Sequence, residues 1–242
     1  LTSSIRRSPP DTQAVPAPLS AIPPRAHNGA MAGIPALFEE AAPGSEPRLV
    51  GLTVEQVDRM TAAGILREGD PVELVDGSLV WKDRASAEGA DMTHGVRHAT
   101  VLNRLQGLDR EVLALGCVLR VQLPVVLSPS SAPEPDLAVA RGTRDSYTVR
   151  HPGPTDLLLV AEVADHSLAY DRKTKQRLYA TAGIPRYLIV NLPEDCFELF
   201  LDPQPADGRY ARRIDHRPGE RLHADLGPAG VLTIELDAIL KR

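Results

Sequence analysis

Two carboxylates in apolar surroundings are the first residues of this sequence that suggest chemistry. Glu162 lies within the nearly continuous apolar run Leu157–Val163, where an ionised carboxylate is costly to bury unless a cation meets it. Asp136 stands at the head of another apolar segment, directly after Pro133-Glu134-Pro135, and prolines favour an extended backbone where a strand begins. Two acids on neighbouring strands can bind one divalent cation together.

A lysine follows these acids on a predicted helix from Asp171 to Ala182. Lys175 shares one helical face with Leu178, Tyr179 and Ala182, and the apolar neighbours predict that this face is buried. An ammonium there can reach the carboxylates and either orient a water or stabilise charge on a phosphate. In the alternative interpretation, Lys175 extends to solvent and Glu162 pairs with an arginine such as Arg172. The pattern leaves both interpretations open.

The elements that must position these residues predict an α/β fold with a central mixed sheet flanked by helices. The run at 157–163 is typical of a strand covered on both faces, and therefore of a sheet centre. Strand, helix and strand between residues 157 and 191 predict a right-handed crossover that joins a parallel pair. Gly183 and Pro185 should end the crossover helix. The expected strands are Val118–Val126, Asp136–Ala140, Leu157–Val163, Tyr187–Asn191 and Phe197–Leu201.

The first half of the predicted domain contains a helix, a hairpin and a second helix. Thr53 and Gln56 form a capping box for a helix that ends near Gly64. Asp76-Gly77 is a common hairpin turn, here between Val72–Val75 and Ser78–Trp81, and it places Glu73 beside the turn. Apolar residues at helical spacing predict a long helix from Val96 to Leu115 that Gly116 ends.

Length and composition favour one folded domain preceded by a tail. The chain has 242 residues, of which 43% are hydrophobic and 24% charged, which is enough for one sizeable core. Residues 1–48 are crowded with Pro, Ala and Ser, so we expect a disordered segment there and a folded domain at 49–242. The sequence begins at Leu1 rather than Met, and an internal start at Met31 is a hypothesis.

The remaining bulk properties narrow the class of protein. No apolar stretch is long enough for a membrane span and no secretion signal is visible, so we expect a soluble, cytoplasmic protein without a membrane partner. Cys117 and Cys196 are far apart, which favours buried free thiols. A net charge of -5 counts against nucleic-acid binding, although basic residues do gather at 97–120, 141–151, 172–177 and 209–221.

An ordered set of motifs resembles the Uma2 family, also called DUF820 and grouped with the restriction endonucleases. The resemblance runs from about Leu52 to Leu201. Each motif alone is weak, but their order along the chain is specific. The motifs are Glu73-Leu74-Val75-Asp76-Gly77, His98 with Val101 and Leu105, Pro135-Asp136-Leu137-Ala138-Val139, Glu162-Val163-Ala164-Asp165-His166-Ser167, Asp171-Arg172 with Lys175, and Tyr179-Ala180-Thr181-Ala182-Gly183-Ile184-Pro185-Arg186-Tyr187.

The resemblance implies a PD-(D/E)xK nuclease that hydrolyses phosphodiester bonds of DNA. In that family pattern Asp136 and Glu162 bind Mg2+ or Mn2+. The lysine has moved from its usual strand position, which is Ala164 here, onto the following helix as Lys175. The resemblance also implies that Glu73 is an extra acid near the metal and that His98 contacts phosphate or water.

Three other interpretations remain at this stage. A nuclease fold can persist as a catalytically silent module that binds nucleic acid or protein, and a structural role is a further option. A homodimer is compatible with all of these. Asp91, His94 and His98 have spacing that could suit zinc, but Gly95 disfavours a helix there and no further ligand is evident.

Overall fold

The computed structural model describes residues 50–67, 69–82 and 95–241. All of them belong to one compact unit of the chain, Leu49–Arg242. The predicted disordered segment at 1–48, with Met31 in it, lies outside the described residues, as do Asp91 and His94 of the possible zinc site. No helix in the described ranges is long and apolar enough to cross a membrane.

The centre of the fold is a mixed sheet, as predicted. Within the described residues it has six strands in the order β3-β4-β5-β6-β7-β8. β5 and β6 run parallel, whereas every other neighbouring pair is antiparallel. The strands are β3 (Cys117–Val121), β4 (Leu137–Arg141), β5 (Leu157–Ala164), β6 (Arg186–Asn191), β7 (Cys196–Gln204) and β8 (Arg209–His216).

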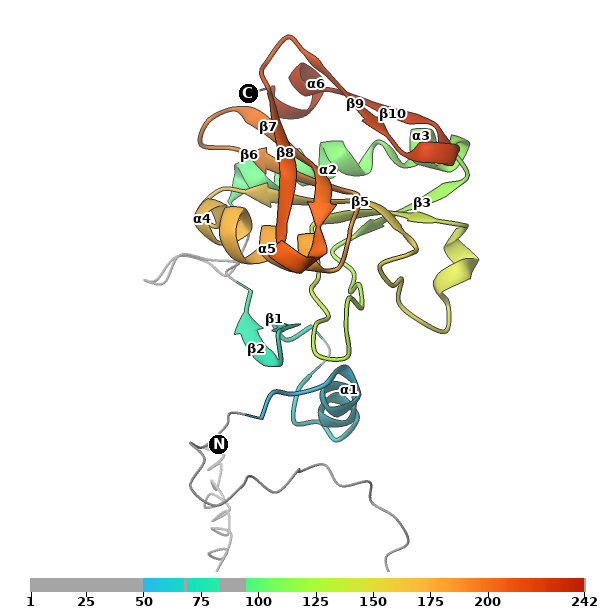
Figure 1. Ribbon diagram of the computed structural model, residues 1–242, viewed down its shortest axis with the longest axis vertical. Helices are drawn as coiled ribbons and strands as arrows, with labels where there is room; N and C mark the ends of the chain where they lie inside the picture. Colours follow the sequence, from blue (N-terminus) through green and yellow to red (C-terminus); the bar gives the residue numbers. More distant parts are fainter. Residues whose placement is uncertain (1–49, 68, 83–94, 242) are drawn as a thin grey trace, which may run out of the picture. The chain divides into compact units, whose positions relative to one another are not determined.

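Each face of this sheet carries its own apolar cluster. One face packs against α2 (Val96–Gln106), α3 (Asp109–Ala114), α6 (Leu236–Leu240) and the hairpin of β9 (Arg221–Asp225) and β10 (Val231–Glu235). The other face packs against α5 (Gln176–Thr181) and the hairpin of β1 (Val72–Val75) and β2 (Ser78–Trp81). Figure 1 shows α4 (Leu168–Tyr170) and α5 on the opposite side of the sheet from α2 and α3. Every residue of β5 is buried, which confirms a strand covered on both faces.

The crossover from β5 to β6 confirms the predicted strand, helix and parallel strand, but its helix differs in detail. It begins earlier than Asp171, with α4 (Leu168–Tyr170), and continues through a π-helical turn, η3 (Asp171–Lys175), into α5. Gly183 adopts a φ of 71° after α5, as expected of a glycine that ends a helix. Single π-helical turns are rare and often occur at functional sites.

The first helix and hairpin agree with their sequence signals. Thr53 and Gln56 form the capping box of α1 (Val54–Ala62). In the hairpin turn Asp76 has a φ of 47° and Gly77 of 79°, which are the two left-handed positions that an Asp-Gly turn supplies. A Cβ on Gly77 would lie 2.7 Å from the Cα of Gly51, so this glycine also permits a close backbone approach.

Two predicted elements were wrong in extent. The strand expected at Val118–Val126 ends at Val121 because Gln122 has a φ of 49° and Pro124 follows without an N–H to donate. The helix expected at Val96–Leu115 is broken into α2 and α3 at Gly107, where a glycine lowers helix stability by about 1 kcal/mol relative to alanine.

Smaller differences affect the ends of strands, whereas the cysteines agree with the prediction. β4 begins at Leu137 rather than Asp136 because the Asp136 N–H donates to the Glu162 side chain instead of a neighbouring strand. β7 extends the expected Phe197–Leu201 strand to both sides. Cys117 and Cys196 are buried free thiols, as predicted.

Candidate active site

The two predicted acids meet across neighbouring antiparallel strands. Leu137 pairs with Ala161, so Asp136 lies opposite Glu162 at the end of the β4–β5 ladder. The Asp136 N–H donates to Glu162 Oε2 at 3.1 Å, and the Val163 N–H donates to Asp136 Oδ2 at 2.9 Å. Each carboxyl group therefore accepts a hydrogen bond from the backbone of the other strand, which holds the two groups close together.

Lys175 enters this pair from the π-helical turn. Its Nζ donates to Glu162 Oε1 at 3.2 Å and to Glu73 Oε2 at 2.8 Å. Only 5% of the residue is exposed, so the alternative in which Lys175 extends to solvent is wrong. The alternative partner of Glu162 is wrong too, because Arg172 pairs with Glu194 and Glu198.

The remaining two predicted residues join the same cluster. Glu73 comes from β1, and its Oε2 also accepts the Glu134 N–H at 3.1 Å. His98 comes from the first turn of α2, and its Nε2 lies 3.2 Å from Asp136 Oδ2. The structure thus brings together all five residues singled out in the sequence, from four separate elements and one loop.

Two further residues contact the acids and were missed as site residues. The Tyr179 hydroxyl donates to Glu162 Oε1 at 2.8 Å, and the Gln122 amide donates to Asp136 Oδ1 at 3.3 Å. Tyr179 had a signal, because a tyrosine on a buried helical face needs a partner for its hydroxyl. Gln122 had no such signal in the sequence. It reaches Asp136 because the backbone turns at the end of β3, where Gln122 has a φ of 49°.

Comparison with known families identifies the chain. A family model described as "Uma2: Putative restriction endonuclease" matches residues 54–236. The chain belongs to the Uma2 family. The described part of this match includes every site residue named above.

Comparison with solved structures supports the Uma2 fold. A chain described as "a putative nuclease belonging to DUF820 from Anabaena variabilis ATCC 29413" matches with a TM-score of 0.54 and 12% sequence identity. The match covers 78% of this chain and 97% of that chain. No curated protein matches. Likeness at this identity shows the fold, and it agrees with the mixed sheet flanked by helices that the sequence predicted.

The Uma2 site contains more negative than positive charge. Lys175 interacts with Glu162, Glu73 and Asp171, and Asp136 interacts with Glu162. With all groups ionised, the four carboxylates outnumber the single ammonium by three. Burial raises the pKa of Glu162 to about 8, against the opposing effect of Lys175. Burial also raises the pKa of Asp171 to about 6, opposed by a hydrogen bond from Ser167.

Asp136 and Lys175 are held in their charged forms. Burial by itself would raise the pKa of Asp136, but hydrogen bonds from His98 and Val163 bring it below its ordinary value. Burial by itself would lower the pKa of Lys175, but the neighbouring Glu162 and Glu73 carboxylates raise it above its ordinary value. Lys175 is therefore a fixed positive charge at neutral pH.

The donor set at this Uma2 site suits a hard divalent cation. Among the described residues, Asp136 Oδ1 and Glu162 Oε2 each accept one hydrogen bond, which leaves each oxygen a lone pair. The described residues contain no ready group of three His, Cys, Asp or Glu side chains for a metal. Two carboxylates are nevertheless the usual protein contribution to a Mg2+ site, because that ion keeps several waters and takes further oxygens from substrate phosphates.

Proposed function

We propose that this protein is a metal-dependent endonuclease that hydrolyses phosphodiester bonds of DNA. The family description and the nuclease named among the solved structures support a nuclease-like role. The observation that carries the proposal is the hydrogen bond from Lys175 Nζ to Glu162 Oε1. The other oxygen of that carboxyl group, Oε2, accepts the N–H of Asp136. Two acids and an amine at one point are the minimum that this hydrolysis needs.

In this proposal Asp136 and Glu162 hold a Mg2+ or Mn2+ ion. When bound, such an ion neutralises charge on the scissile phosphate and lowers the pKa of a coordinated water. His98 orients the Asp136 carboxylate through its Nε2 contact. The net negative charge of the buried cluster favours a dication there, since opposite charge within a few ångströms is strongly stabilising in a poorly solvated site.

Lys175 acts in this proposal as a cation rather than as a base. Its raised pKa keeps the ammonium protonated, so it can stabilise negative charge on a phosphoryl oxygen or orient a water by donating to it. Glu73 and Glu162 both accept hydrogen bonds from this ammonium and hold it in place. The Tyr179 hydroxyl fixes the oxygen of Glu162 that Lys175 also contacts.

Nicking of supercoiled plasmid DNA tests the proposal. Wild-type protein should nick DNA with Mg2+ or Mn2+ and not with EDTA. Asp136→Asn and Lys175→Met should each lower the rate by about 100-fold or more, as loss of an electrostatic group at a reacting centre does. Asp202→Asn is the matched control, because Asp202 is an exposed acid that pairs with Arg212 on the far strands.

Two outcomes would contradict the proposal. One is wild-type protein that shows no metal-dependent nicking, and the other is nicking that Asp136→Asn leaves unchanged. Either result favours the second candidate function, a catalytically silent module of nuclease fold that binds nucleic acid or protein.

A further inference from the structure

A second buried carboxylate lies on the same face of the sheet as Glu162. Glu162 pairs with Ile189 on β6, and Ile189 pairs with Glu198 on β7. Residues paired in register point to the same face, so Glu162 and Glu198 form one row two strands apart. Glu198 is fully buried, and the site described above does not use it.

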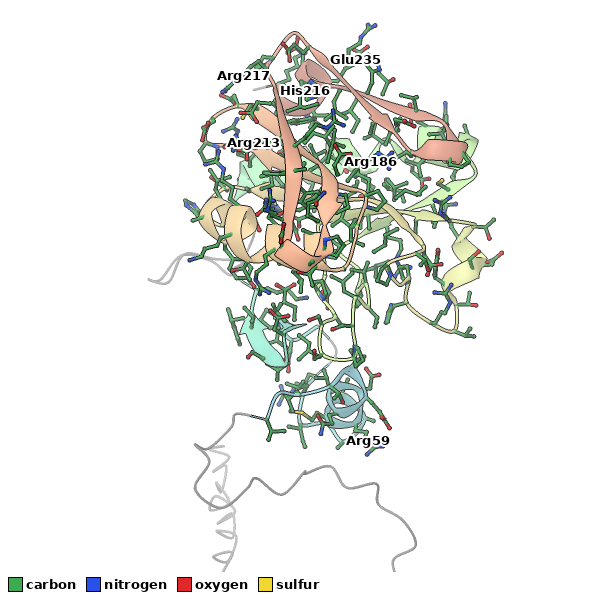
Figure 2. All side chains as sticks on the ribbon, viewed as in Figure 1. Arg59, Arg186, Arg213, His216, Arg217 and Glu235 are labelled. Carbon is green, nitrogen blue, oxygen red and sulfur yellow. The ribbon has the colours of Figure 1, made fainter. Side chains whose placement is uncertain are left out.

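Glu198 is bound by the same π-helical turn that carries Lys175. Arg172 Nε donates to Glu198 Oε2 at 3.0 Å. Asn191 Nδ2 donates to Glu198 Oε1 at 2.7 Å. Arg213, which Figure 2 labels on β8, approaches Glu198 Oε2 at 3.4 Å. One turn therefore binds two strands of the sheet, because Lys175 donates to Glu162 on β5 and Arg172 donates to Glu198 on β7.

This arrangement fixes the position of the turn along the sheet. A buried ion pair adds little stability over well-packed apolar side chains, but removing or misplacing one partner leaves an uncompensated buried charge. A shift of the turn by one residue would separate Arg172 from Glu198 and Lys175 from Glu162 together. Such a shift is therefore strongly disfavoured.

We infer that Glu198 and Arg172 are positioning residues that place Lys175 against Glu162. The inference rests on the proposed function for its catalytic consequence, but the placement of Lys175 can be measured without any activity. The side chain of Lys175 is 6% exposed, so amine-reactive acetylation of this lysine, read by mass spectrometry, reports whether it stays in place.

The experiment compares Glu198→Gln with Tyr210→Phe in the full chain. Tyr210→Phe is the control because it removes a buried hydrogen bond, to the Ile184 carbonyl, without touching Arg172 or Lys175. Well below the unfolding temperature, Glu198→Gln should increase acetylation of Lys175 several-fold and lower the cleavage rate, by up to about 100-fold for a displacement near 1 Å. KM for DNA should not change. Tyr210→Phe should leave acetylation and cleavage as in wild type.

A double variant separates the effect on the position of Lys175 from the effect on the stability of the protein. Arg172→Met with Glu198→Leu replaces the pair by apolar side chains and should recover stability, while Lys175 remains open to acetylation. The inference is overturned if Lys175 stays protected in Glu198→Gln, or if the double variant restores full protection. If wild-type protein cleaves no DNA, the proposed function fails while acetylation alone still decides whether Glu198 positions Lys175.

Discussion

Glu162 is the residue whose protonation couples the site to stability. Its carboxyl is buried among Lys175, Tyr179 and the Asp136 backbone, and burial raises its pKa to about 8 from 4.5. The folded protein therefore binds this proton more tightly than the unfolded chain. Between pH 4.5 and pH 8 the free energy of unfolding therefore falls as pH rises, because the unfolded chain releases the proton at a lower pH than the folded protein.

The first prediction concerns the pH dependence of unfolding without metal. In EDTA, the contribution of Glu162 is fully favourable below about pH 4.5 and is lost as pH rises toward 8, with a slope of at most about 1.4 kcal/mol per pH unit. Glu162→Gln cannot ionise and should remove this slope, so its free energy of unfolding relative to that of wild type should rise between pH 5 and pH 8. Urea unfolding at pH 5 to 9 measures both proteins.

Asp171 also makes the free energy of unfolding depend on pH. Its raised pKa of about 6 adds a separate loss of stability at lower pH, which Glu162→Gln should leave in place. Equal slopes for wild type and Glu162→Gln between pH 6 and 8 would show that Glu162 does not hold its proton in the folded state.

At the scale of elements, the site depends on two connections that are far apart in the chain. The crossover supplies Lys175 from the π-helical turn, and the β1–β2 hairpin supplies Glu73. The hairpin is held in place by the bridge of Leu74 with Ala132 and by an ion pair of Asp76 with Arg177. Both connections must dock correctly for the Lys175 ammonium to lie between two carboxylates.

The second prediction concerns the hairpin turn. Gly77→Ala combines a left-handed φ with a Cβ that would lie 2.7 Å from Gly51 Cα. It should lower the free energy of unfolding by about 2 kcal/mol or more, since strain and a backbone clash add. Gly219→Ala is the control, because Gly219 has a φ of 89° but nothing within 4 Å of its Cβ position, and it should cost about 1 kcal/mol. Equal losses would show that the approach to Gly51 does not constrain the turn.

At the scale of the whole molecule, both apolar clusters lie within one unit. Every residue of these clusters lies between Leu49 and Arg242, and the family match spans 54–236. The third prediction is that a chain starting at Leu49 unfolds at the same temperature as the full chain, within about 2 °C, a shift that corresponds to about 0.5–1 kcal/mol. Calorimetry measures this, and a clearly lower midpoint would assign residues 1–48 a part in the fold.

The surface charge of this unit bears on how an acidic protein meets DNA. The basic stretch at 209–221 is largely neutralised, with Arg209, Arg212, Arg213 and Arg221 each in an ion pair with a nearby acid. Exposed pairs of this kind contribute little to stability. In the proposed function, a bound dication therefore supplies part of the attraction for phosphate.

The sequence by itself determined the local parts of this protein. The capping box at Thr53, the Asp-Gly hairpin turn and the almost wholly apolar β5 each follow from a few adjacent residues. The parallel crossover follows from the order of strand, helix and strand between residues 157 and 191. Glu162 was identifiable because burying a charge in an apolar strand demands a partner. Asp136 followed from its place at the head of an apolar strand and Lys175 from its buried helical face. The family motifs then added Glu73 and His98, and the structure brings all of these residues together.

Only the tertiary structure decided which charges pair. Arg172 and Lys175 lie one turn apart, and periodicity cannot tell which of them reaches Glu162. The register of β5, β6 and β7 assigns Lys175 to Glu162 and Arg172 to Glu198. The physical reason is that a pairing in a sheet is a contact between residues far apart in sequence, whereas periodicity reports only which face each residue occupies.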